Sequence, residues 1–234
     1  MNRSRSTMRA GKTVVVTALM GIVAALGVSA PAAWGAPATA TPSWAVAPAG
    51  TYHYRQVSPA ANPAPTGTVV VAAAGAGVQL WTRSFGAQAA VSTSAISYKS
   101  SGIYALAQSE QLSGTTLACS FAAPPAVLPS PPTAGLTFSG HGACTSAATL
   151  TVSGAVAGNV MLSFNGQSVS TVLVSSTSVM SVSVLGITYQ VDVTEVDWYL
   201  PTLPIPLQTA IHVAIPSQKS TSDSEFVLQS ITQP

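Results

Sequence analysis

The chain has 234 residues, of which 47% are hydrophobic and only 6% carry a charged side chain. Its formal net charge is +2, but four of the eight basic residues precede residue 13, which leaves four basic against six acidic residues in the rest. So few cations cannot neutralise many phosphates, which argues against nucleic-acid binding. About 200 residues remain beyond the N-terminal segment, enough for one domain with a sizeable core.

Residues 1–36 have the pattern of a helical secretory signal peptide. A basic start is followed by an uncharged apolar run at 13–28 and then by small residues, with cleavage expected after Gly35 or Ala36. The apolar run is shorter than the roughly 20 residues that span a bilayer, so a cleaved signal is favoured over a retained anchor. We expect a secreted or cell-envelope protein with no stable membrane span after cleavage. There is no cysteine near the cleavage region to carry a lipid.

The remainder of the chain predicts a Pro/Ala-rich linker followed by a β domain. Residues 37–49 are a linker or an arm lying across the sheet, because Pro and Ala dominate and no clear period appears. The β domain is expected to cover 50–234. Its first strand alternates, with Tyr52 and Tyr54 on one face and His53 and Arg55 on the other.

Turn residues divide the domain into about ten short strands. Gly102 in Lys-Ser-Ser-Gly allows a tight turn, and Asn165-Gly166 is the strongest hairpin signal in the chain, joining 159–164 to 167–174. These strands, with no credible helix after the signal, predict a single antiparallel all-β domain. A curved sheet, half-barrel or barrel is expected, with a β-sandwich as the alternative.

The two cysteines, Cys119 and Cys144, are expected to form a disulfide. An exported chain meets an oxidising compartment, and these two residues are the only available pair. The bond would close a loop of about 25 residues and stabilise the fold by roughly 3–4 kcal/mol. Within that loop, residues 122–136 hold five prolines, which remove amide donors. We therefore expect a stiff strap that crosses a sheet end and is not a paired inner strand.

The same region carries a family resemblance. The segment CSFAAPPAVLPSPPTAGLTFSGHGAC, the hairpin GNVMLSFNGQSVSTVLV and the segment ITYQVDVTEVDWYLPTLPIPLQT resemble secreted or lipoprotein-type β-rich proteins of unknown function from actinobacteria and related high-GC bacteria. The resemblance covers about residues 50–216. Phe138 stands where a Trp is expected, and the lipid-anchoring cysteine is missing. The resemblance implies a β fold and an exported location, and it implies no chemistry.

An acidic patch of Asp192, Glu195 and Asp197 is the best candidate for chemistry. On a strand, Glu195 and Asp197 point to the same face about 7 Å apart, a separation used by paired carboxylates in glycoside hydrolysis. The same pattern is typical of a solvated strand face, which is the interpretation we favour over a hydrolase or a calcium site. Trp198 and Tyr199 are expected to fill the end of the core.

The histidines give weaker signals. Ser139 lies close to His141, but the Gly-x-Ser-x-Gly spacing of a hydrolase nucleophile is absent. His53, His141 and His212 lack the short spacing of a metal site. We assign no catalytic residue, no metal ligand and no cofactor.

The sequence therefore predicts a non-catalytic exported protein. The leading hypothesis is a module that binds an apolar small molecule or lipid inside a curved sheet. The alternatives are a structural or adhesive cell-envelope protein and a carboxylate-dependent hydrolase. A pocket of several hundred Å³ would favour the first. The oligomeric state is not predicted.

Overall fold

The computed structural model describes residues 44–85, 91–112, 115–184, 187–200 and 202–234. The expected signal peptide and the first part of the expected linker lie outside these residues. The elements are β1 (Gly50–Ser58), β2 (Thr66–Ala73), β3 (Val78–Phe85), β4 (Val91–Lys99), β5 (Gly102–Leu112), β6 (Thr115–Phe121), β7 (Ala126–Pro129), β8 (Thr137–Cys144), β9 (Thr149–Phe164), β10 (Gln167–Val184), β11 (Ile187–Tyr199), β12 (Pro206–Ile215) and β13 (Ser220–Thr232), with 3-10 turns η1 (Thr145–Ala147) and η2 (Pro216–Gln218).

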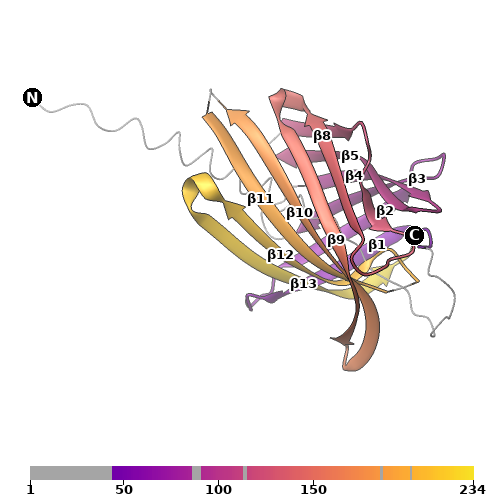
Figure 1. The fold of residues 1–234 in the computed structure, drawn as a ribbon. Helices are drawn as coiled ribbons and strands as arrows, with labels where there is room; N and C mark the ends of the chain where they lie inside the picture. The colour runs from indigo at the N-terminus through magenta and orange to yellow at the C-terminus, as the bar shows by residue number, and fades with distance from the viewer. Residues whose placement is uncertain (1–43, 86–90, 113–114, 185–186, 201) are drawn as a thin grey trace, which may run out of the picture.

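Twelve of these strands form a closed antiparallel barrel. Each strand pairs with the next along the chain, except that β6 pairs with β8 and leaves β7 outside the ring. The first and last strands, β1 and β13, pair with each other, and the pairing of β4 with β5 closes the ring. In Figure 1, β9 to β12 lie in front and β2 to β5 cross behind them. The expected all-β, barrel-like fold is confirmed, with twelve ring strands instead of about ten.

Alternation along the strands divides side chains between the barrel interior and the outer surface. On β3, residues 79, 81, 83 and 85 are buried and the intervening ones are partly or fully exposed. Twelve strands enclose a wider space than eight. Large side chains fill it, including Trp81, Arg83, Tyr52 and Tyr54, which are at most 2% exposed. The buried hydrophobic residues form one continuous cluster.

The predicted hairpin is confirmed, and the strands beside it are longer than expected. Asn165 and Gly166 both have positive φ, 49° and 76°, as a tight two-residue turn between β9 and β10 requires. The expected strand 159–164 and the alternating run that precedes it up to residue 156 are one strand, β9, with a register shift opposite Leu173 and Val174. A bulge bends a strand without ending it, so two runs in the sequence become one element.

The disulfide is confirmed, and it ties neighbouring strands together. Cys119 on β6 and Cys144 on β8 are register partners and are bonded. Within the expected strap at 122–136, Ala126–Pro129 forms a short strand, β7, which lies outside the ring and pairs with the start of β5. Prolines restrict a strand but permit a short one at the edge of a sheet, which is where β7 lies.

Candidate functional site

The three residues of the acidic patch do not share a face. Glu195 and Asp197 point to the same side of β11, as predicted, but this side is the barrel interior, where they are 2% and 4% exposed. Asp192 has the opposite parity and accepts a 2.8 Å hydrogen bond from Gln190 Nε2 at the surface. The expectation of a solvated face was therefore wrong for Glu195 and Asp197, because barrel closure turns that face inward.

The aromatic residues at the end of β11 also divide between the two faces. Tyr199 fills the interior and is 3% exposed, as predicted. Trp198 is only partly buried, and its side chain packs against the core from the other side of the strand. The strand alternates to its end, so only one of two neighbouring aromatics can enter the barrel.

Arg83 brings a positive charge into the same interior. It lies on β3, is 2% exposed, and has partners within the fold, as do Glu195 and Asp197. Arg83 is not among the candidate residues predicted from the sequence. A usable signal was present, since Trp81 and Phe85 flank Arg83 on its own face of an alternating strand. Residues two apart on a strand share a face, so the two aromatics predict that Arg83 faces the core with them.

The pKa values of two buried tyrosines, Tyr54 and Tyr199, are shifted by burial and by the charges in this interior. Tyr199 donates a 3.1 Å hydrogen bond to Asp197 Oδ2. Burial raises the pKa of the Tyr199 hydroxyl well above its usual value, and the negative charge of Asp197 raises it further, while the positive charge of Arg83 acts against both. Burial likewise raises the pKa of Tyr54, with Arg83 again opposing. Both phenols therefore stay neutral and available as donors.

Polar side chains surround these charges. In the strand register, Arg83 is the partner of Ser92 on β4, and Asp197 is the partner of Thr209 on β12. Ser92 and Thr209 are 1% and 0% exposed. The other buried polar side chains facing the interior are those of Gln79, Ser94, Gln108 and Ser178. Polar side chains therefore enter the largely apolar interior from two parts of the ring, β3 to β5 and β10 to β12.

The hollow beside Asp197 is very small. Its volume is about 10 Å³, and its lining includes Ser176 and Tyr199 together with apolar side chains. Such a space holds one water molecule at most. A glycosidase needs a sugar between its two carboxyl groups, and the hollow beside Asp197 is far too small to hold one.

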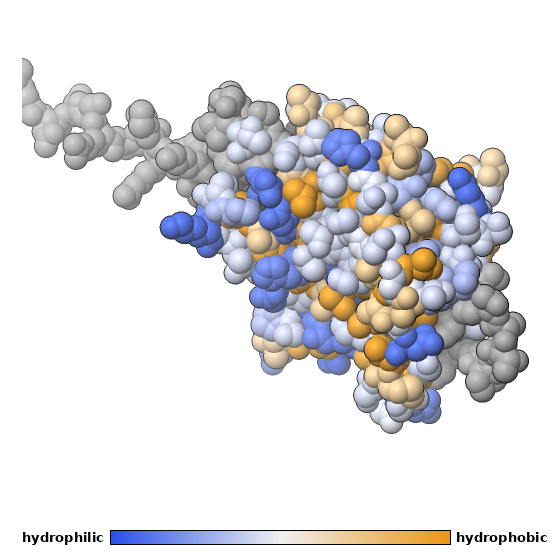
Figure 2. Space-filling view, in the orientation of Figure 1, coloured by the Kyte–Doolittle hydropathy of each residue, from blue (hydrophilic) through white to orange (hydrophobic). Residues whose placement is uncertain are grey.

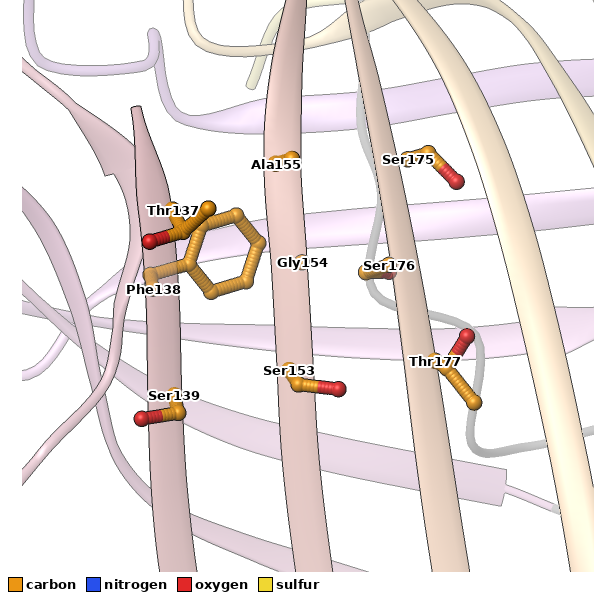
Figure 3. Close-up of a pocket in the computed structure, with 9 residues that line it drawn as sticks. All are labelled: Thr137, Phe138, Ser139, Ser153, Gly154, Ala155, Ser175, Ser176 and Thr177. Carbon is orange, nitrogen blue, oxygen red and sulfur yellow. The ribbon is translucent and has the colours of Figure 1, made fainter. Parts of the chain in front are cut away.

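A much larger depression, about 540 Å³ in volume, lies on the outer wall. It is formed by β8, β9 and β10 and is lined by Thr137, Phe138, Ser139, Ser153, Gly154, Ala155, Ser175, Ser176 and Thr177 (Figure 3). The Phe138 ring lies over Gly154, where an added Cβ would come within 2.3 Å of the ring. The depression is therefore a shallow surface of hydroxyl and small side chains over a closed wall.

This wall carries almost no charge. Between residues 111 and 191 the sequence has no Asp, Glu, Lys or Arg, a stretch that spans β6 to β10 and the first part of β11. Figure 2 shows the corresponding face in pale colours, with only scattered strongly hydrophobic or hydrophilic residues. Hydroxyl groups of Ser and Thr supply most of its polarity. We call the outward face of β8, β9 and β10 the neutral wall.

The three histidines lie apart, on β1, β8 and β12. His53 and His141 are near threonine hydroxyls, at 3.4 Å from Thr232 Oγ1 and 3.1 Å from Thr151 Oγ1. His212 is 2.7 Å from Asp223 at the surface. Within the described residues, no three His, Cys, Asp or Glu side chains gather as a metal site would require. Ser139 lines the outer depression, and its neighbour His141 is engaged with Thr151.

The fold and site define a closed twelve-stranded barrel with a filled interior and a neutral outer wall. No known family model, curated protein or solved structure matches this chain. Within the described residues, no helix is long and apolar enough to cross a membrane.

Proposed function

We propose that this protein is an exported, non-catalytic structural or adhesive component of the cell envelope, and that it acts through its outer surface. One observation carries the proposal: the large depression lies outside on the neutral wall, while the hollow described inside the barrel has a volume of only about 10 Å³. An oxidising compartment outside the cytoplasm suits the Cys119–Cys144 disulfide.

The chemistry of the neutral wall suits a neutral polymer rich in hydroxyl groups, such as a polysaccharide. Ser and Thr side chains both donate and accept hydrogen bonds, directly or through water. A surface without ionised groups neither repels such a polymer nor demands a counter-charge from it. Individual contacts of this kind are weak, and a repeating polymer strengthens them by engaging several copies of the protein at once.

The apolar-ligand hypothesis has less support. Small-molecule sites usually have volumes of about 300–1,000 Å³, and the interior hollow beside Asp197 is far smaller. The interior also buries Arg83, Glu195 and Asp197, and an acyl chain would gain nothing from contact with charged side chains. The hydrolase hypothesis has less support still, because both carboxylates are inaccessible to a polymeric substrate.

Cosedimentation with purified cell-wall polysaccharide tests the proposal. We expect Ser153→Glu, which places a charge at the centre of the neutral wall, to reduce the bound fraction at least threefold. The matched control is Thr221→Glu, an exposed position on β13, which should bind as the unaltered protein does. If the protein fails to sediment with any uncharged cell-wall polysaccharide, or if both variants lose binding equally, adhesion through the neutral wall of the protein is refuted.

Native mass spectrometry of the protein from culture medium distinguishes the proposed structural or adhesive role from the apolar-ligand hypothesis. We expect a mass equal to that of the chain alone. Excess mass that leaves on denaturation, with a lipid recovered by extraction, would transfer the assignment to the apolar-ligand hypothesis.

A further inference from the structure

The small hollow beside Asp197 is shielded from solvent by the barrel wall. Its volume of about 10 Å³ is close to the smallest that admits one water molecule. Apart from Ser176, none of the side chains around it is more than 8% exposed. The complete lining consists of Val127, Phe138, Val152, Val174, Ser176, Asp197 and Tyr199. Size therefore limits the occupant to one water molecule or one small ion.

Three polar side chains give the hollow its hydrogen-bonding capacity. Ser176 lies on β10, and Asp197 and Tyr199 lie on β11. Tyr199 donates its hydroxyl proton to Asp197 Oδ2 at 3.1 Å, which leaves the phenol oxygen able to accept a hydrogen bond. A carboxylate accepts several hydrogen bonds, and a serine hydroxyl both donates and accepts. A water molecule can therefore donate to Asp197 and Tyr199 and accept from Ser176, and three bonds are typical of a buried water.

An ion fits the same hollow poorly. Calcium and magnesium ions take about six oxygen ligands, whereas four of the seven lining side chains are apolar. An anion would lie against the negative charge of Asp197. The chemistry of the lining therefore favours water.

The hollow lies directly behind the depression on the neutral wall. Phe138 and Ser176 line both spaces. Both residues are register partners of Gly154, so the three form one row across β8, β9 and β10. Gly154 contributes no side chain to this row, and the Phe138 ring lies beside it (Figure 3). The ring therefore covers the thinnest part of the wall between the hollow and the solvent.

We propose that the hollow binds one structural water molecule through Asp197, Tyr199 and Ser176, and that Phe138 controls the exchange of this water with the outer depression. A water enclosed in this way leaves only when the surrounding side chains move. The site is independent of what the neutral wall binds, because the water lies behind that wall.

Oxygen-17 relaxation dispersion tests the water site, because it counts waters that stay bound longer than the protein takes to rotate. Val152 and Val156 provide a matched pair, since both are buried on β9 and only Val152 lines the hollow. Val152→Ile adds a methyl group at the hollow and should remove one long-lived water. Val156→Ile should leave the number unchanged. An unchanged number in Val152→Ile would overturn the proposal.

A measurement on the unaltered protein tests the same site without any substitution. The methyl groups of Val152 and Val174 line the hollow, so both should show nuclear Overhauser effects to a long-lived water. The absence of these effects would overturn the proposal, whether or not the variants fold.

Residence times test the roles of Ser176 and Phe138. Ser176→Ala should shorten the residence time of the water at least about twofold, as expected for loss of one hydrogen bond. Ser175→Ala, at a position that lines only the outer depression, should leave it unchanged. Equal residence times in these two variants would overturn the assignment of Ser176 as a ligand of the water.

Phe138→Leu should keep the water but loosen its cover. Even a small reduction in the barrier to exchange shortens the residence time at least about threefold. The control is Phe121→Leu, because Phe121 is 6% exposed and lines neither space. An unchanged residence time in Phe138→Leu, or an equal shortening in both variants, would overturn the control of exchange by Phe138.

Discussion

Replacing Arg83 with methionine tests whether the buried charges depend on one another. The substitution keeps a long side chain but removes the cation, so the interior charge of Arg83, Glu195 and Asp197 changes from −1 to −2 when all are ionised. These side chains are 2%, 2% and 4% exposed, so water screens them little. Removing one partner of a buried charge pair typically costs 3–5 kcal/mol.

That loss is large on the scale of a whole domain. Domains of this kind are stable by about 5–15 kcal/mol. For 150–250 residues each kcal/mol corresponds to about 2–4 °C in the unfolding temperature, so Arg83→Met should unfold about 6–20 °C lower. Equilibrium urea unfolding followed by circular dichroism measures the free energy directly, and calorimetry measures the temperature.

Two further variants isolate the electrostatic cause. Arg55→Met removes an exposed arginine from β1 and should change stability by no more than about 0.5 kcal/mol. Adding Glu195→Gln and Asp197→Asn to Arg83→Met should recover part of the loss, since no charge then remains buried in the cluster. A loss below 1 kcal/mol for Arg83→Met, or a triple variant no more stable than the single one, would refute this reasoning.

Three other predictions concern stability. Burial raises the pKa of Tyr52 to about 12, compared with 10 in the unfolded chain. The stability that the neutral Tyr52 hydroxyl contributes is therefore complete below pH 10 and is lost as the pH rises from 10 to 12. The free energy of unfolding should fall across that window, and a flat profile would contradict the burial argument. Replacing Cys119 and Cys144 together with serine should lower the free energy of unfolding in urea by roughly 3–4 kcal/mol. If reducing the disulfide of the wild-type protein leaves its free energy of unfolding unchanged, this prediction is wrong. Gly154→Ala should cost about 1–3 kcal/mol, because its Cβ would lie 2.3 Å from the Phe138 ring and 2.6 Å from the backbone oxygen of Ser175; an unshifted melting curve would contradict this close packing.

Local patterns in the sequence were sufficient for the all-β class, one hairpin and the disulfide. Strand geometry dictates that residues two apart share a face, so Glu195 and Asp197 could be placed together without any tertiary information. Asn165-Gly166 specifies its turn through the positive φ of both residues. The disulfide followed from a single pair of cysteines. The strand and turn inferences depend only on residues that are near in sequence, and the disulfide inference depends on there being only one possible pair of cysteines.

Only the tertiary structure determined which strand faces lie inside the barrel and which distant side chains come together there. Alternation says which side chains share a face, but only the pairing of β4 with β5 and of β1 with β13 determines which face becomes the interior. That closure buries Glu195 and Asp197 and brings the charge of Arg83 into their surroundings from a distant strand. It also encloses the hollow beside Asp197. These contacts are long-range, and the free energy that selects them belongs to the packed barrel and not to any one strand.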